Sequence, residues 1–328
     1  MKTIIVMGSG YRGWNIALHL ITKGRYNKVV CIDNYSKHDI TKEVQENKLK
    51  NPIHISQRIE MLNYHTRKHN AIFEFGDITN YEFMKKMFEK HNPDIVINCA
   101  KQYSNEFCNK NDETNIYTLQ NNVIGLVTLL SNMNKKNMKL ININSIYNKG
   151  DMITLHNFTE KIYLQKFALK NKITIADVFC GDMYGIKLKN IYDKNIFASV
   201  DYDNIFGSFT NRLITQFLLH EKIFIYGNEK RRIPILYLQD FVEGIAKIIV
   251  MSKNKTGYFS IGLYSEFITL GNIIAKIKNE NSFIKYIRDK KNESLHEIDI
   301  PNQINLKMTK FDDVHKSVSE EFKKVMTI

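Results

Sequence analysis

The first 33 residues constrain the fold of this chain more than any other part. A short apolar run at residues 3–7 leads directly into the turn Gly8-Ser9-Gly10-Tyr11-Arg12-Gly13. An amphipathic stretch, residues 14–23, follows the turn, and a second apolar run ends in the acidic residue Asp33. This order of strand, glycine turn, helix, strand and acid predicts a βαβ unit at the start of a parallel sheet.

The spacing of the glycines and of Asp33 is that of a dinucleotide-binding turn. Gly8 permits a tight exit from the strand, Gly10 lets the backbone approach a pyrophosphate, and Gly13 lets the helix pack closely on the strand. The phosphates then lie at the amino end of the helix, where N–H groups and the helix dipole favour an anion. Asp33, 20 positions after Gly13, suits the adenosine ribose hydroxyls and repels a 2′-phosphate, which predicts NAD(H) over NADP(H). A strand-turn-helix with incidental glycines is the alternative interpretation.

Length and composition set the class of protein. With 328 residues, of which 43% are apolar, the chain can bury a substantial core in one compact unit or two closely joined domains. The first apolar run is too short for a signal peptide and no apolar run reaches 18 residues, so we expect a soluble cytoplasmic protein without a membrane partner. The four cysteines, Cys31, Cys99, Cys108 and Cys180, lack CxxC spacing, so neither a metal site nor a disulfide framework is predicted.

The net charge of +13 would by itself permit a nucleic-acid-binding protein. The lysines, however, are scattered along the whole chain, with only short clusters such as Lys230-Arg231-Arg232. A biased composition with solvated faces is the simpler interpretation, and no nucleic-acid partner is predicted. A positive field would still attract a small anionic substrate.

Short apolar runs alternate with helical patterns well beyond the opening unit. This alternation predicts an α/β fold, a doubly wound parallel sheet of the Rossmann type with a smaller substrate-binding cap. We expect residues 1–180 to form the dinucleotide-binding domain, residues 236–262 to return to it, and residues 181–235 and 263–328 to form the cap. The polar stretch 36–69 interrupts the alternation and is expected to be a helical or irregular excursion.

Several motifs carry a resemblance to a known family over residues 1 to about 275. They are residues 8–14 (GSGYRGW), 31–34 (CIDN), 76–78 (GDI), 120–125 (QNNVIG), 201–207 (DYDNIFG) with Asn211-Arg212, and 225–227 with Asp240. In these motifs the chain resembles the extended short-chain dehydrogenase/reductases, the NAD-dependent nucleotide-sugar epimerases and dehydratases, and among them most closely the sulfoquinovose synthases.

The resemblance implies an NAD site. The residues concerned are Gly8, Gly10, Tyr11, Gly13, Asp33, Asn34, Asp77, Ile78 and Asn121. Asp77 and Ile78 follow the third strand, where a carboxylate can accept a hydrogen bond from the adenine amino group and a backbone N–H can face a ring nitrogen. Asn121 has a second interpretation, because an asparagine inside a helix often only bridges backbone groups.

The resemblance also implies a nucleotide-sugar substrate, with a UDP-sugar favoured. Thr210, Asn211 and Arg212 match the stretch that faces the substrate diphosphate, and the guanidinium of Arg212 would fit phosphate oxygens bidentately. A solvated arginine on a helix is the alternative. Tyr103, also assigned to the substrate site, stands where the sulfoquinovose synthases carry an arginine that touches both cofactor and substrate.

The chemistry of the family requires a Ser or Thr after the fifth strand, and a Tyr with a Lys four residues later on the next helix. Ser145 fits the first role. The register counted back from Asp177 places Ile153 and Asn157 at the Tyr and Lys positions, so the pair is missing. YxxxK occurs elsewhere in the chain, as expected by chance in a Tyr- and Lys-rich sequence. None of these matches follows the fifth strand. Tyr147 is the candidate for a displaced acid, although it could instead pack or cap.

Two hypotheses of different classes follow. The first is an NAD-dependent enzyme that oxidises a nucleotide sugar transiently through a rearranged or weakened proton relay. The second is a catalytically impaired homologue that binds NAD and a nucleotide sugar as a regulatory or assembly module. Under either hypothesis the resemblance implies a homodimer that pairs helices at residues 113–134 and 155–169.

Overall fold

The structure is a computed structural model of the chain. It describes residues 2–24, 26, 28–41, 54–133, 137–146, 152–186, 188, 200–220, 222–226, 228–278, 283–287 and 301–325, and the statements below concern these residues. The sequence motifs at residues 8–14, 31–34, 76–78, 120–125 and 201–207 all fall inside them.

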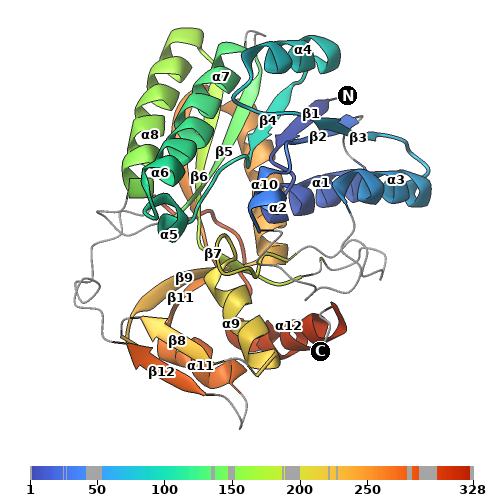
Figure 1. Ribbon diagram of the computed structural model, residues 1–328. Helices are drawn as coiled ribbons and strands as arrows, with labels where there is room; N and C mark the ends of the chain where they lie inside the picture. The colour runs from blue at the N-terminus through green and yellow to red at the C-terminus, as the bar shows by residue number, and fades with distance from the viewer. Residues whose placement is uncertain are drawn as a thin grey trace.

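A seven-stranded sheet with the strand order β10-β6-β5-β4-β1-β2-β3 forms the larger part of the molecule (Figure 1). Each strand pairs in parallel with its neighbours. The strands are β1 (Thr3–Met7), β2 (Lys28–Asp33), β3 (Ala71–Phe75), β4 (Ile95–Asn98), β5 (Lys139–Ser145), β6 (Thr174–Cys180) and β10 (Gly257–Leu263). The doubly wound parallel fold predicted from the sequence is confirmed.

Side chains of successive strand residues alternate between the two faces of this sheet. In β1, Ile4 and Val6 pack into one apolar cluster, while Ile5 and Met7 pack into another on the opposite face. Helices cover both clusters (Figure 1). The first face carries α1 (Tyr11–Lys23), α3 (Ile55–Thr66) and α10 (Leu238–Met251), and the second carries α4 (Tyr81–His91), α7 (Gly125–Ser131) and α8 (Met152–Asn171).

The helix predicted at residues 113–134 is divided into three parts. It begins as α6 (Asp112–Leu119), passes through η1 (Gln120–Ile124), a π-helical turn, and continues as α7. Single π-helical turns within helices occur frequently at functional sites. Short helices also occupy the described parts of the polar stretch 36–69, namely α2 (Ser36–Thr41) and α3, and α5 (Asn105–Cys108) follows β4.

The remaining elements form a smaller body at the carboxyl ends of the large sheet (Figure 1). Strands in the order β11-β9-β7 make one small sheet, and β12 pairs with β8 in another. Their own apolar cluster includes Phe217, Phe311 and Phe322. The elements are β7 (Asp182–Tyr184), α9 (Phe209–Leu218), β8 (Ile223–Tyr226), β9 (Arg232–Tyr237), β11 (Glu266–Thr269), α11 (Leu270–Ile277), β12 (Ile284–Ile287) and α12 (Phe311–Val325).

Residues 236–262 provide α10, a 3₁₀ turn (Ser252–Asn254) and most of β10, which extends the large sheet beside β6. The division of the chain into a dinucleotide-binding domain, to which residues 236–262 return, and a cap stays a prediction. In the described part of the chain, no helix combines the length and apolar character needed to cross a membrane. The same residues contain no group of three or more His, Cys, Asp or Glu side chains that could hold a metal ion.

Candidate functional site

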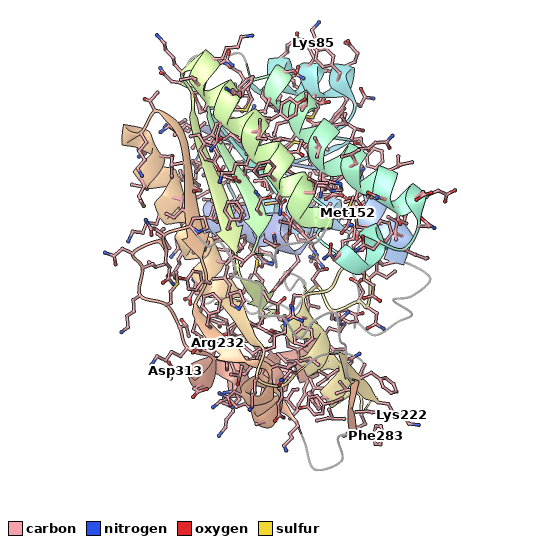
Figure 2. The ribbon with its side chains drawn as sticks, turned by 90° about the vertical axis from the view of Figure 1, so that its left-hand side faces the viewer. Lys85, Met152, Lys222, Arg232, Phe283 and Asp313 are labelled. Carbon is pink, nitrogen blue, oxygen red and sulfur yellow. The ribbon has the colours of Figure 1, made fainter. Side chains whose placement is uncertain are left out.

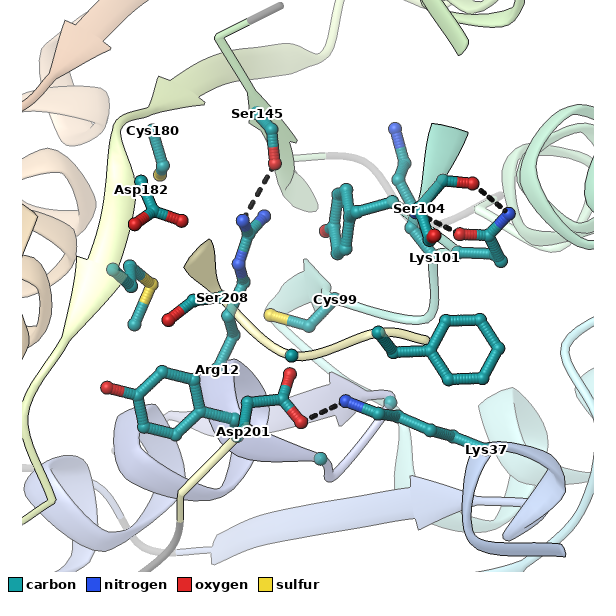
Figure 3. A pocket seen from close by; sticks show the side chains of 18 of the residues that line it. Arg12, Lys37, Cys99, Lys101, Ser104, Ser145, Cys180, Asp182, Asp201 and Ser208 are labelled. Atoms are coloured by element: carbon teal, nitrogen blue, oxygen red, sulfur yellow. Dashed lines mark hydrogen bonds and ion pairs between the residues drawn. The ribbon is translucent and has the colours of Figure 1, made fainter. Parts of the chain in front are cut away.

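A cavity of about 490 Å³ lies where the carboxyl ends of the parallel strands face the smaller body. Strands β1 and β4 are neighbours, yet the helix after β1 covers one face of the sheet and the helix α7 after β4 covers the other. Ligands of doubly wound folds bind at such a switch point. Figure 3 shows side chains from both bodies around this cavity.

The glycine turn forms one end of the cavity, and its three glycines have different surroundings. Gly8 has φ of +75°, and a Cβ there would lie 2.6 Å from backbone atoms of Ala100. A Cβ on Gly13 would lie 1.8 Å from the carbonyl oxygen of Gly8. A Cβ on Gly10, by contrast, would meet no atom within 4 Å. Gly10 therefore faces open space at the start of α1, where no side chain caps the helix N-terminus, and a phosphate could approach the backbone.

Asp33 lies beside this turn at the end of β2. Its Oδ2 accepts a hydrogen bond from the N–H of Ser9 at 2.5 Å, and its Oδ1 accepts one from the N–H of Tyr35 at 2.7 Å. Burial raises the pKa of the Asp33 carboxyl, although these hydrogen bonds oppose the shift. Asp33 lines the cavity, so its carboxylate is placed where a ribose hydroxyl could donate to it.

The other predicted cofactor residues surround the same end. Asn34 donates from Nδ2 to Oδ2 of Asp77 at 2.8 Å. Burial acts to raise the pKa of Asp77, but hydrogen bonds from the N–H and hydroxyl of Thr79 and from Asn34 outweigh it and lower the pKa. The cavity is lined by Asn34, Ile78 and Asn121. Asp77 is not a lining residue and accepts the hydrogen bond from Asn34. Asn121 donates to the carbonyl of Ala100 at 3.2 Å, as a backbone-bridging asparagine would, and its contact with the cofactor stays a prediction.

Tyr11 joins the two bodies. Its hydroxyl donates to the carbonyl of Gly185 at 2.7 Å, and its side chain is buried. Burial raises the pKa of the Tyr11 phenol far above its ordinary value. Tyr11 lines the cavity, and its hydroxyl is already engaged as a donor to the smaller body.

The other end of the cavity is formed by the carboxyl ends of β4, β5 and β6. Arg12 reaches across it and donates from Nη2 to Oγ of Ser145 at 2.7 Å (Figure 3). Its guanidinium carbon lies 3.9 Å from the ring centre of Tyr103, whose hydroxyl donates to the carbonyl of Ile143. Cys99 and Cys180 line the same region. Burial raises the pKa of both thiols to about 12, although the charge of Arg12 opposes the shift.

The helix on which the resemblance led us to expect the Tyr and Lys, α8, is described over its whole length, and none of its residues lines the cavity. Ile153 is fully buried and Asn157 is 8% exposed. Glu160 on the same helix forms a buried ion pair with Lys101, whose amino group also binds Asn144. Tyr147, the predicted displaced acid, lies outside the described residues.

The residues predicted for the substrate diphosphate separate into two groups. Arg212 lines the cavity, and its Nη1 donates to the carbonyl of Asn204 at 3.3 Å. Thr210 and Asn211 are fully buried and are not among the lining residues. Thr210 donates from its hydroxyl to Asp182 at 2.6 Å, and Asn211 accepts from the N–H of Gly185 at 3.0 Å. Both therefore build the start of α9 in this structure, and a direct substrate contact for either stays a prediction.

Two arginines that the sequence analysis treated as part of a solvated cluster belong to the site. Arg231 and Arg232, at the start of β9, line the cavity on the side of the smaller body. Figure 2 shows Arg232 in this body, away from the long helix α8 that begins at Met152. Their position in the sequence could have indicated this, because they stand directly before an apolar run that forms a strand. Residues there lie at the end of a strand, at the edge of the sheet.

The sequence model of the NAD dependent epimerase/dehydratase family matches residues 4–262. The chain belongs to this family. The family resemblance inferred from the motifs is confirmed, and NAD is the cofactor of the family. The turn at Gly8, Gly10 and Gly13 and the carboxylate of Asp33 fit it, because the one glycine that faces open space is the one that a pyrophosphate must approach.

Known relatives agree with this assignment. The chain is 22% identical over 311 residues to the UDP-sulfoquinovose synthase of Sulfolobus acidocaldarius. This match covers 84% of this chain and 78% of the relative. It is 24% identical over 293 residues to the chloroplastic UDP-sulfoquinovose synthase of Spinacia oleracea, covering 79% of this chain. The match spans only 60% of the length of the spinach protein.

Solved structures share the fold. The UDP-glucose 4-epimerase from Bifidobacterium longum, solved in complex with NAD+ and UDP, has a TM-score of 0.72 at 16% identity over 98% of both chains. The UDP-glucuronic acid 4-epimerase from Bacillus cereus, solved with UDP-glucuronic acid and NAD, has a TM-score of 0.69 at 15% identity, covering 98% of this chain and 99% of that one. Both fold likenesses extend through the smaller body as well as the large sheet.

Proposed function

We propose that the protein binds a UDP-sugar beside NAD and modifies the sugar by hydride exchange, with slow proton transfer. The observation that carries this proposal is the continuity of one cavity from the glycine turn to Arg212, Arg231 and Arg232 on the smaller body. A guanidinium group matches phosphate oxygens bidentately. Three guanidinium groups opposite the dinucleotide site are suited to bind the diphosphate of a substrate, in addition to the pyrophosphate of NAD.

The proposed chemistry uses few side chains of this protein. NAD, when bound, supplies a hydride acceptor. Ser145 presents its hydroxyl at the end of β5 and could hydrogen-bond a sugar hydroxyl, with Arg12 holding its oxygen in place. Arg12 cannot take a proton, because a guanidinium group stays charged in proteins. No residue of α8, which is fully described, offers a phenol or amine to the cavity.

The alternative proposal is a module that binds NAD and a nucleotide sugar without turning the sugar over. Its support is the pair Ile153 and Asn157, two side chains without a proton to exchange near neutral pH. General acid–base assistance contributes typically ~10²–10⁴ in rate. The two proposals therefore share the binding site and differ in the expected turnover.

One experiment tests both parts. UDP-glucose, UDP-galactose and a panel of GDP-sugars are added to the NAD-loaded protein, binding is measured by calorimetry, and bound NADH is followed by its absorbance. We expect UDP-sugars to bind and Arg212→Met to weaken them, while NADH accumulates slowly. Rapid turnover that Tyr147→Phe abolishes would contradict the slow-transfer proposal and identify Tyr147 as a relocated acid. Absence of UDP binding would contradict the substrate assignment.

We also propose the predicted homodimer. Exposed apolar side chains gather on the two helices expected to form it, which are neighbours in the fold (Figure 1). They are Ile116, Leu119 and Ile124 on α6 and η1, and Leu155, Phe158, Ile162, Tyr163 and Leu169 on α8. Exposed apolar side chains on neighbouring helices suit a subunit interface. Sedimentation at micromolar concentration tests it, and a monomer there would contradict it. The cytoplasmic location stays a prediction.

A further inference from the structure

Segment 201–207 (DYDNIFG) lies at the edge of the cavity, shortly before the helix α9 that carries Arg212. Asp201 and Phe206 of this segment line the cavity. The segment contains two carboxylates, Asp201 and Asp203. A carboxylate beside a cavity that is proposed to bind phosphate groups would repel the ligand unless a cation compensates it.

Lys37 of the large body supplies this cation. It lies on α2, four residues after Asp33, and lines the cavity. Its amino group forms an ion pair with Asp201 (Figure 3), and Oδ2 of Asp203 lies 3.9 Å from the same nitrogen. Burial raises the pKa of Asp201, and the charges of Lys37 and, to a smaller extent, Arg12 oppose the shift. The charge of Lys37 likewise opposes the rise in the pKa of Asp33. The amino group is therefore engaged by three carboxylates of the protein.

Hydrogen bonds within the segment hold it in one shape. Oδ1 of Asp203 accepts from the N–H of Ile205 at 2.9 Å and from the N–H of Phe206 at 2.5 Å. An aspartate that binds the backbone two residues later forms an Asx turn, which fixes the local chain direction. The carbonyl of Asp201 accepts from the N–H of Ser208 at 3.1 Å, and Ser208 is the N-cap of α9. The turn is thus joined directly to the start of the helix.

Arg212 takes its orientation partly from this turn. Its Nη1 donates to the carbonyl of Asn204 at 3.3 Å. The turn itself is attached to the large body at a second place, because the ring centre of Phe206 lies 5.0 Å from that of Phe107 on α5. A guanidinium that is bonded to a turn carbonyl moves when the turn moves. The position of Arg212 therefore depends on contacts that the segment makes with the large body, including the ion pair of Lys37.

We infer that Lys37 is a positioning residue of the substrate site. It holds segment 201–207 against the large body, and this segment orients Arg212 toward the substrate diphosphate. The inference rests on the proposed function, in which Arg212 binds that diphosphate. The ion pair connects α2, which follows Asp33 at the adenosine end, with the start of α9 in the smaller body. The substrate site is therefore complete only while the two bodies are joined at this ion pair.

UDP binding to the NAD-saturated protein, measured by calorimetry, tests the inference. Lys37→Met should weaken UDP binding by roughly three- to ten-fold, the size usual for coupled side chains, and Asp201→Asn should have a similar effect. Lys37→Arg can still pair with Asp201 and should keep most of the affinity. The matched control is Lys85→Met on α4, an exposed position far from Arg232 in Figure 2. It removes the same charge and should leave UDP affinity unchanged.

A double-mutant cycle separates positioning from direct contact with the ligand. If Lys37 acts through Arg212, Lys37→Met should change UDP affinity little in an Arg212→Met background, because the guanidinium that it positions is absent. Additive losses would overturn the inference, since Lys37 would then contact UDP itself. Wild-type UDP affinity in Lys37→Met, or a loss confined to NAD affinity, would also overturn it and leave the proposed function intact.

Failure of the proposed function has a different signature. In that case the wild type does not bind UDP, or Arg212→Met binds it as tightly as the wild type. Thermal melts verify that each variant is folded. If Lys37→Met does not fold, Asp201→Asn takes its place in the same cycle, with the same expected loss of effect in the Arg212→Met background.

Discussion

The two ends of the cavity differ in how closely they keep to the family pattern. At the adenosine end, Gly8, Gly10, Gly13 and Asp33 all have the surroundings that their motif roles require. At the reaction end, Arg12 fills space beside Ser145, and α8 presents neither a phenol nor an amine to the cavity. Both ends are built on the same sheet.

The difference follows from what each end depends on. The glycine turn is part of the backbone packing, since a Cβ on Gly8 or Gly13 would overlap main-chain atoms. The reaction end depends on side chains such as Ser145 and Arg12, which line the cavity at the ends of the strands. The cofactor end is therefore tied to the backbone packing and the reaction end to its side chains, so that function has to be argued from the site.

The largest expected effect is a low rate of catalysis at the reaction end, although the adenosine end is complete. We expect the wild type to turn over UDP-glucose more slowly than the Bifidobacterium longum epimerase by roughly 10²–10⁴, the usual contribution of general acid–base catalysis. Steady-state assays of both proteins under the same conditions measure the ratio. Equal rates would show that another group, such as Tyr147, supplies the proton transfer that Ile153 and Asn157 cannot.

The double variant Ile153→Tyr with Asn157→Lys sharpens this prediction. Ile153 is fully buried, so a phenol there would overpack the core and cost about 1–3 kcal/mol of stability. We expect a lower melting temperature and little recovered activity. A stable double variant with restored turnover would show that α8 can present its side chains to the cavity after all.

The next largest expected effect is a loss of stability when a side chain is added to the glycine turn at the adenosine end. Gly13→Ala would place a methyl group 1.8 Å from the carbonyl oxygen of Gly8, and we expect it to cost about 3 kcal/mol or more of the free energy of unfolding. Gly10→Ala is the matched control. Its methyl group meets no protein atom within 4 Å, so we expect stability within about 1 kcal/mol of the wild type but weakened NAD binding.

Urea unfolding and NAD calorimetry on both variants measure the contrast. If Gly10→Ala binds NAD as tightly as the wild type, the open space at Gly10 is not the pyrophosphate site. If Gly13→Ala is as stable as the wild type, the close approach of α1 to the turn is relaxed at little cost.

The sequence predicted the sheet and the adenosine end because both depend on local patterns. Apolar runs fix strands, and glycine spacing fixes a turn. It did not predict Arg12, because neither the glycine pattern nor the resemblance assigned a role to this position. It placed Arg231 and Arg232 in a solvated cluster, because sequence neighbours alone do not reveal which body lies opposite. Thr210 and Asn211 match a substrate stretch in sequence, yet burial decides which of its side chains face the cavity.

A moderate effect is expected at Asp33. Asp33→Ala removes the acceptor of two backbone N–H groups and of the predicted ribose hydroxyls. We expect NAD binding to weaken by about 1–3 kcal/mol, and the preference for NAD over NADP to decrease. Calorimetry with both dinucleotides measures this. Tighter binding of NADP than NAD by the wild type would contradict the role of Asp33.

The smallest expected effect is a pH dependence confined to the same residue. Burial raises the pKa of Asp33 in the folded protein, so the folded protein without NAD holds this proton more tightly than the unfolded chain does. The resulting stabilisation is fully present below the unfolded pKa of about 4 and is lost as pH rises through the raised folded value. NAD affinity should change in the opposite direction, rising over the same interval, because ribose hydroxyls donate to the ionised carboxylate.

Asp33→Asn isolates this effect from all other titrating groups. The difference in unfolding free energy between wild type and variant, measured without NAD, should fall as pH increases from about 4 toward neutrality. The ratio of their NAD affinities should increase over the same range. Parallel pH profiles for the two proteins would mean that Asp33 titrates as it does in the unfolded chain, and that its carboxyl is not desolvated at the adenosine end.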